Sequence, residues 1–384
     1  MSGTIDVYAG TVLTPGETYS GAVISVVDGR IDGINESPER SADLSFPDGI
    51  AIPGLIDVHT HGFGGHCATS GHASDVAEIA ESAPSHGVTT VFPTTMSATH
   101  GRLLDAASAF AAARARAAGG ADLPGLHLEG PYFTDDGHSG VQDPDTFREP
   151  SVDELDELLD AADGGIARVT LAPELDGALE FVRAAKRRGL VVSAAHSDAG
   201  YERTRTAFDS GVSLVAHLYN GMAQFHHRRP GLVGGALVAD GVAVELIADG
   251  VHLHPAAVEL AIRAKGVENV LLVSDSAPYA GCPDGEYEIG GRRVVVSDGA
   301  CRADDGETLA GSALTLDGAV RTVVDETSVD LADAVAMATA NPARELSLLD
   351  RGRLATGYRG DIAVLDGDLD VVATVVEGTV QYRR

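Results

Sequence analysis

Short runs of apolar residues recur along the middle of the chain and alternate with longer stretches rich in Ala, Leu and Arg. The runs are continuous rather than alternating, which is typical of parallel strands buried on both faces. Eight such runs are present: GLIDVH (54–59), VTTVFPT (88–94), PGLHLEG (124–130), IARVTLAP (166–173), LVVSAAH (190–196), VSLVAH (212–217), VAVELIAD (242–249) and NVLLVSD (269–275). The stretches between and after them predict helices over 74–86, 101–118, 151–162, 176–188, 200–210, 254–265 and 330–348. This alternation predicts a parallel (β/α)₈ barrel of the TIM type.

Both ends of the chain have a different pattern, with short strands separated by Gly-containing turns. The strands are expected at 4–9, 22–27 and 30–34 and, near the C-terminus, in DIAVLD (361–366) and VVATVVEGTVQY (371–382). Neither end is large enough to form a stable sheet alone. We therefore expect residues 1–52 and 352–384 to pair into one small β-sandwich domain, and residues 53–351 to form the barrel. Residues 279–311 are rich in Gly and short β-like runs, which predicts an insertion after the eighth strand.

Polar side chains follow the ends of several predicted barrel strands, the end at which barrel enzymes carry their active sites. Strand seven runs into Asp249 and His252. Other predicted strands end in residues whose side chains can bind a metal, namely His59, His61, Glu129, His196, His217 and Asp275. Neutral imidazole and carboxylate are good ligands for zinc and similar divalent ions. The set therefore predicts a metal centre on the barrel axis.

Within this set, His59 and His61 lie two residues apart on a strand, so both side chains point the same way. Alone, such a pair would be structural as often as metal-binding; the other ligands favour the metal. A carboxylate such as Glu129 at the end of a buried strand is costly unless it is paired or metal-bound. Asp275 is the candidate general acid and base, because a carboxylate beside a metal-bound water can accept its proton. A role as a metal ligand or helix N-cap stays open for Asp275.

The charge balance excludes some partners. Asp and Glu number 57 against 27 Lys and Arg, which gives a formal net charge of -30. A field of this sign repels nucleic acid and anionic membranes. The acids are spread along the whole chain, and Lys occurs only at Lys186 and Lys265. This pattern indicates a folded acidic surface adapted to high intracellular salt.

The sequence gives no sign of export or membrane insertion. Three scattered cysteines imply no disulfide framework. We find neither a signal-peptide pattern at the start nor an apolar run of about 18 residues. We therefore expect a soluble, cytoplasmic protein.

A basic cluster stands out in this acidic chain: His226, His227, Arg228 and Arg229 follow one another. Such a cluster could bind an anion such as a sugar phosphate. A solvated surface loop or an ion pair at an interface is the alternative. No Walker-type Gly-rich loop is present, so a nucleotide is not implied.

From about residue 50 onward, the chain resembles N-acetylglucosamine-6-phosphate deacetylases of the amidohydrolase superfamily. The blocks that carry the resemblance are PGLIDVHTHGFGG (53–65), GLHLEGPYF (125–133), VTLAPE (169–174), AHS (195–197), AHLYNGM (216–222), RPGLVGG (229–235), IADGVHLHP (247–255), VSDSAPYAG (273–281) and LAGSALTLDGAVR (309–321). HLEGP and HLYNGM are the specific ones, whereas HxH alone indicates only the wider superfamily. The implied reaction is metal-dependent hydrolysis of the N-acetyl group of an amino-sugar phosphate.

The resemblance also implies individual roles. Glu129, His196 and His217 match the family's metal site, and Asp275 matches the catalytic acid and base. Residues that match the sugar-phosphate site or line the same pocket are Val141, Asn220, Gly221, Arg228, His252, Leu309, Ala310 and Gly311. The family is typically dimeric, with a basic side chain from the partner at the phosphate, and His227 is the candidate for it. The His59/His61 pair allows a second ion, so we expect one or two, with zinc as the default.

One departure and several rival functions remain. Gly140, Val141 and Gln142 occupy the place of a family Gly-Thr-His, so Gln142 or His138 would polarise the acetyl carbonyl. A deacetylase for the galactosamine epimer and a deaminase stay open. Cyclic amidases usually need a carboxylated lysine, and no Lys lies at a predicted strand end. A catalytically inactive regulatory barrel is disfavoured by the complete ligand set.

Overall fold

The computed structural model describes residues 3–36, 42–116, 119–134, 137–289, 292–297, 299–303, 306 and 308–384. Its centre is a nearly closed parallel barrel, with one strand in each of the eight predicted apolar runs. In spatial order these are β14 (Val270–Leu272), β13 (Ala243–Leu246), β12 (Leu214–Val215), β11 (Val191–Ala194), β10 (Ile166–Leu171), β9 (Leu126–Glu129), β8 (Val88–Thr95) and β5 (Leu55–Thr60). The predicted barrel is therefore confirmed.

The first and last strands meet just beyond β14. The backbone N–H of Asp275 donates to the carbonyl of His59 at 2.9 Å, and the N–H of His61 donates to the carbonyl of Ser276 at 3.0 Å. These bonds bring Asp275 beside His59 at the end of β5 and His61 just after it.

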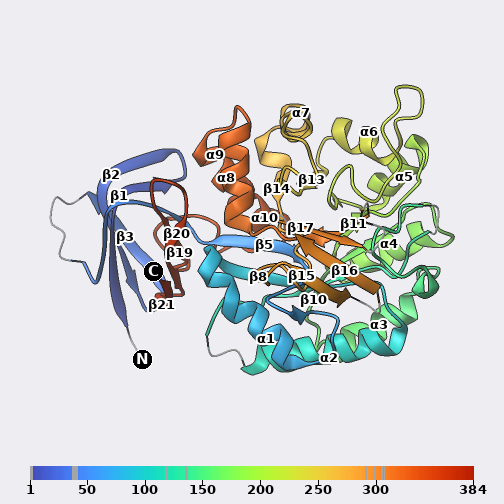
Figure 1. The fold of residues 1–384 in the computed structure, drawn as a ribbon, viewed down its shortest axis with the longest axis horizontal. Coiled ribbons are helices and arrows are strands. Elements are labelled where there is room, and N and C mark those ends of the chain that lie inside the picture. The colour runs from blue at the N-terminus through green and yellow to red at the C-terminus, as the bar shows by residue number, and fades with distance from the viewer. Residues whose placement is uncertain are drawn as a thin grey trace.

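Helices cover the outside of the barrel (Figure 1). They are α1 (Ala73–Ser82), α2 (His100–Arg116), α3 (Val152–Ala161), α4 (Ala178–Arg187), α5 (Tyr201–Ser210), α6 (Gly231–Val238), α7 (Pro255–Lys265), α8 (Leu316–Glu326), α9 (Leu331–Met337) and α10 (Ala340–Glu345). Short elements complete the barrel domain: β6 (Gly62–Phe63), β7 (His66–Cys67), η1 (Ala83–His86), η2 (Pro144–Thr146) and η3 (Val267–Asn269). The sequence did not predict α6 or α8, and residues 117–118 of the predicted second helix lie outside the described residues.

The helix expected over 330–348 is divided into α9 and α10, which corrects that prediction. Pro342 has no N–H, and its ring clashes with the carbonyl four residues earlier in a continuous helix. That residue is Ala338, the C-cap of α9, which ends at Met337.

The two chain ends pair as expected, and all their strands join one sheet. Its order is β21 (Thr379–Arg383), β20 (Val371–Val376), β19 (Ile362–Leu365), β4 (Leu44–Pro53), β1 (Thr4–Thr14), β2 (Glu17–Val27) and β3 (Arg30–Glu36). Alternate residues of the central strands face opposite ways. Ala51 and Val364 belong to the sheet's own core, whereas Ile52 and Ala363 pack with the barrel core. The domain limits at residues 52 and 352 stay a prediction.

The predicted insertion forms a small antiparallel sheet beside the barrel mouth. Its strands are β15 (Gly285–Ile289), β16 (Arg292–Ser297), β17 (Ala300–Ala303) and β18 (Leu309–Ser312). Ser312 anchors it, because its N–H donates to the carbonyl of Asp275 at 2.8 Å. The Leu309–Gly311 segment is thereby held against the end of the eighth strand. Among the described helices, none has the length and apolar character needed to cross a bilayer.

Candidate metal centre

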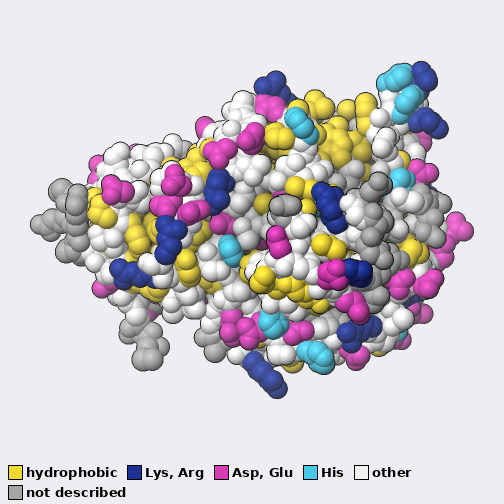
Figure 2. Space-filling view, viewed as in Figure 1, with side chains coloured by type: hydrophobic (Ala, Val, Ile, Leu, Met, Phe, Trp, Pro, Cys, Tyr) yellow, Lys and Arg dark blue, Asp and Glu magenta, His cyan; other side chains and the backbone are white. Residues whose placement is uncertain are grey.

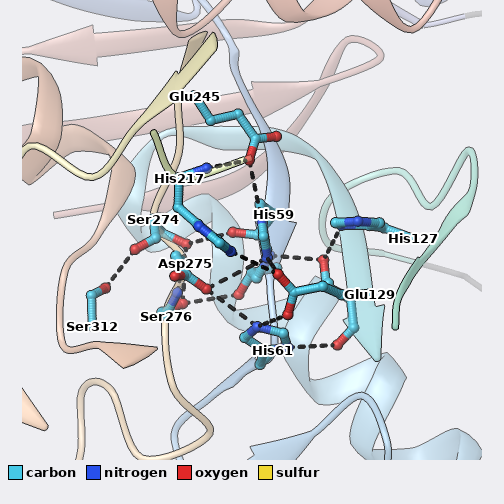
Figure 3. A network of polar contacts seen from close by, with 12 residues as sticks. His59, His61, His127, Glu129, His217, Glu245, Ser274, Asp275, Ser276 and Ser312 are labelled. Carbon is cyan, nitrogen blue, oxygen red and sulfur yellow. Dashed lines mark hydrogen bonds and ion pairs between the residues drawn. The ribbon is translucent and has the colours of Figure 1, made fainter. Parts of the chain in front are cut away.

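Six predicted side chains converge at the carboxyl ends of the barrel strands; Figure 3 shows five of them. His59 lies on β5 and His61 directly follows it, Glu129 ends β9, and His196, His217 and Asp275 follow β11, β12 and β14. All six residues are at most 8% exposed. The convergence expected from the barrel register is therefore present.

Three of these residues leave their strands with a left-handed backbone. The φ angles are 46° at His196, 33° at His217 and 46° at Asp275. Non-glycine residues in this region are disfavoured by about 1–2 kcal/mol each, and such strain concentrates at functional sites. Because the backbone turns at these residues, their side chains enter the barrel mouth instead of continuing the alternation of the strand.

Glu129 is shared by two groups of candidate ligands. The groups are His59, His61 and Glu129, and Glu129, His196 and His217, and the ligand atoms of each lie within 4.8 Å of one another. Glu129 Oε1 lies 2.9 Å from His217 Nε2 and 3.4 Å from His59 Nε2, whereas Oε2 lies 3.4 Å from His61 Nε2. Each group could therefore hold a divalent cation, with Glu129 as a member of both.

The buried carboxylates of the cluster favour positive charge beside them. Burial opposes protonation of His61, but contacts with Asp275 and Glu129 outweigh it and raise the pKa of His61 to about 9. Burial would likewise raise the pKa of Asp275, yet His59 and His61 outweigh it and lower that pKa to about 2. His59 Nε2 is also buried without a hydrogen-bond partner. These residues fit a divalent cation, which would replace protons on the imidazoles and use the unpartnered nitrogen.

Asp275, just beyond the eighth strand, contacts the two histidines of the group His59, His61 and Glu129. Its Oδ1 lies 3.2 Å from His61 Nε2 and 3.5 Å from His59 Nε2. Ionised and next to the ligands, it can accept a proton from a water activated there.

A cavity of about 290 Å³ opens above the cluster. Most of the predicted substrate residues line it, namely Val141, Gln142, Asn220, Gly221, His252, Leu309, Ala310 and Gly311. His252 is oriented by Asp249, whose Oδ2 lies 2.6 Å from His252 Nδ1. The cavity has room for one sugar-sized ligand beside the metal ligands.

Arg228 and His227 do not line this cavity. Arg228 borders a neighbouring cavity together with His138. His227 and Arg228 belong to the loop before α6. This loop projects from the molecule, with histidine and basic side chains gathered at its tip (Figures 1 and 2). Within one chain, the basic cluster therefore lies away from the metal ligands.

Gln142 and His138 contact two of the candidate ligands. The Gln142 amide donates to Glu129 Oε2 at 2.6 Å, and its oxygen accepts from the N–H of Ser97 at 2.6 Å. The carbonyl of His138 lies 2.7 Å from His196 Nδ1. Which of the two side chains polarises the acetyl carbonyl stays a prediction.

Two charged residues beneath the cluster were missed by the sequence analysis. Glu245 on β13 and Arg168 on β10 are fully buried and form an ion pair, and Glu245 also contacts His59 (Figure 3). Burial would raise the pKa of Glu245, but Arg168 and His59 lower it to about 2. The available signal was a charge inside an apolar strand that is buried on both faces.

Known proteins resemble the chain along nearly its whole length. The pattern of the Amidohydrolase family matches residues 50–381. N-acetylglucosamine-6-phosphate deacetylase of Bacillus subtilis (strain 168) is 34% identical, over 97% of this chain and 95% of that protein. N-acetylgalactosamine-6-phosphate deacetylase of Escherichia coli O157:H7 is 37% identical, over 92% of this chain and 93% of that protein.

Solved structures agree with this. The N-acetyl-D-glucosamine-6-phosphate deacetylase of Mycobacterium smegmatis, a mutant bound to N-acetyl-D-glucosamine-6-phosphate, superposes with a TM-score of 0.93 at 32% identity, covering 98% of this chain and 99% of that one. The N-acetylglucosamine-6-phosphate deacetylase of Thermotoga maritima gives 0.89 at 33% identity, covering 99% and 100%. With its barrel, its ligand groups and these relatives, the chain belongs to the amidohydrolase family.

Proposed function

We propose that the protein hydrolyses N-acetylglucosamine 6-phosphate to glucosamine 6-phosphate and acetate. The observation that carries the proposal is Asp275 Oδ1 lying 3.2 Å from His61 Nε2, beside two ligand groups that share Glu129. The relatives that cover nearly the whole chain are deacetylases of amino-sugar 6-phosphates. This supports an acetamide as the substrate group.

Asp275 is the proton carrier of the proposed reaction. A divalent ion bound at these ligands supplies a Lewis acid that polarises a carbonyl and lowers the pKa of water. The ionised Asp275 takes a proton at its carboxylate from the water that attacks the acetyl carbon. It then delivers this proton to the amide nitrogen, so that the C–N bond breaks and the free amine and acetate leave. Gln142 or His138 donates to the acetyl oxygen, where negative charge develops.

The walls of the 290 Å³ cavity hold the sugar phosphate. Asn220, Gly221 and His252 bind its polar groups, and Val141 with the segment Leu309, Ala310 and Gly311 closes the opposite side. Arg228 and His227 complete the phosphate site from the projecting loop. Because that loop lies away from the metal ligands of its own chain, His227 would serve the partner in a homodimer.

The proposal also covers the identity of the metal and the cellular environment of the enzyme. Imidazole and carboxylate ligands suit zinc, and the two groups around Glu129 accommodate one or two ions. The net charge of -30 and the scarcity of lysine support a cytoplasmic enzyme of a salt-loving cell.

The test is acetate release in multimolar potassium chloride from three sugars at equal concentration. They are N-acetylglucosamine 6-phosphate, its galactosamine epimer and unphosphorylated N-acetylglucosamine. We expect the first to give the highest kcat/KM and the unphosphorylated sugar to be turned over poorly. The epimer is the second candidate substrate, because the E. coli O157:H7 relative acts on it and is 37% identical. No acetate from any of the three would contradict the proposal.

A further inference from the structure

Glu245 lies beneath both ligand groups, on β13, and is fully buried. Its Oε2 is 2.9 Å from His59 Nδ1 and accepts from the backbone N–H of His217 at 3.3 Å. Its other oxygen, Oε1, accepts from the guanidinium of Arg168. One carboxylate thus contacts a ligand residue from each group (Figure 3).

The contact with His59 decides which ring nitrogen is free. The ionised carboxylate only accepts, so His59 must carry its proton on Nδ1. In the neutral ring, the form that binds a cation, the lone pair then lies on Nε2, which is buried, without a hydrogen-bond partner and 3.4 Å from Glu129 Oε1. A hydrogen bond at the distal nitrogen of a metal-binding histidine fixes its tautomer and its ring orientation.

The contact with His217 acts on the backbone. His217 has a left-handed φ of 33°, and its N–H points back into the barrel to the same Oε2. Such a conformation persists only where surrounding contacts hold it. Glu245 therefore steadies the strand end that presents His217 to Glu129.

Arg168 orients the Glu245 carboxylate. Its Nε donates to Ser193 Oγ at 2.9 Å and one terminal nitrogen donates to Glu245, while the whole side chain is buried. A guanidinium can only donate hydrogen bonds, so the atom of residue 245 that faces Arg168 must be an acceptor oxygen, here Oε1. The second oxygen is left for His59 and His217.

We propose that Glu245, held by Arg168, is a positioning residue that sets the tautomer of His59 and so makes the group of His59, His61 and Glu129 competent for a cation. The inference rests on the metal centre of the proposed function but not on its substrate. Zinc binding without any sugar therefore tests it separately.

The test is a zinc titration of metal-free protein, with bound zinc counted per chain. We expect two ions in the wild type. In Glu245→Gln the amide oxygen must face Arg168, so its NH₂ faces His59 Nδ1 and forces the proton onto Nε2. We expect the affinity for the second ion, the one held by His59, His61 and Glu129, to fall about 10–100-fold. In the double variant Arg168→Met/Glu245→Gln the amide is free to turn its oxygen to His59, and we expect the second ion to return.

Asp361→Asn is the matched control, because it also removes a buried carboxylate paired with an arginine, Arg359, but away from the ligands. It should bind zinc like the wild type. A role limited to the ion pair between Arg168 and Glu245 would give no rescue, because the double variant lacks that pair. Wild-type zinc affinity in Glu245→Gln, absence of rescue, or a single ion in the wild type would each overturn the proposal. If the zinc counts are as expected but the wild-type protein releases no acetate from the sugar phosphates, only the proposed function is contradicted.

Discussion

The two oxygens of Glu129 face different histidines, and this division organises the centre at the scale of single residues. Oε1 contacts His217 and His59, while Oε2 contacts His61 and accepts from Gln142. A carboxylate with all these partners cannot also act as a mobile proton carrier. Asp275, which approaches from another strand, is free to do so.

Replacing Asp275 with Asn should therefore abolish turnover while keeping the ligands in place. We expect kcat to fall by about 10²–10⁴-fold, the usual contribution of a general acid and base. The amide has nearly the same shape, so the zinc content and the thermal midpoint should stay near those of the wild type. Steady-state kinetics beside metal analysis checks this. Activity within a few-fold of the wild type would rule out Asp275 as the proton carrier.

The sequence could place the candidate ligands together because most of them end an apolar run, and barrel strands present that end at one mouth. It could not predict Glu245 or Arg168 in their roles. Both lie within apolar strands, and their pairing depends on β10 and β13 facing each other across the barrel interior. The contact of Gln142 with Glu129 was also hidden, because a loop conformation decides where that amide points.

At the scale of elements, predictions succeeded where the pattern was strong. All eight strands were found, since fully buried parallel strands give continuous apolar runs. Helix α6 was missed because GLVGGALV is short and rich in Gly, which disfavours helix formation. Tertiary burial decides there instead, since six of its eight residues are buried.

Strand β4 joins the two domains, and Ile52 is its anchor on the barrel. The Ile52 side chain is fully buried and packs with the barrel core, opposite to Ala51. We expect Ile52→Ala to lower the free energy of unfolding by about 2–5 kcal/mol through loss of apolar contacts and the cavity left behind. Val380→Ala on β21, where the side chain is 39% exposed, is the control and should change it by less than about 0.5 kcal/mol. Equal effects in a denaturant titration would show that β4 does not anchor the sheet.

At the scale of the whole molecule, the net charge of -30 causes repulsion among the charged side chains, and this repulsion lowers the stability of the folded state. Acidic side chains are scattered over the visible face rather than gathered in one patch (Figure 2). Salt shortens the range of this repulsion from about 10 Å at 0.1 M to about 3 Å at 1 M. We expect the thermal midpoint to rise steadily from 0.1 M to about 2 M potassium chloride. A midpoint that stays constant or falls would contradict adaptation to high salt.

The decisive experiment measures acetate release from N-acetylglucosamine 6-phosphate by metal-free protein before and after zinc is restored, in multimolar potassium chloride. We expect no acetate above background without metal and strong turnover once zinc is bound, with no recovery in Asp275→Asn. Turnover by the metal-free protein, or none by a folded and zinc-loaded one, would contradict a metal-dependent deacetylase built on Glu129 and Asp275.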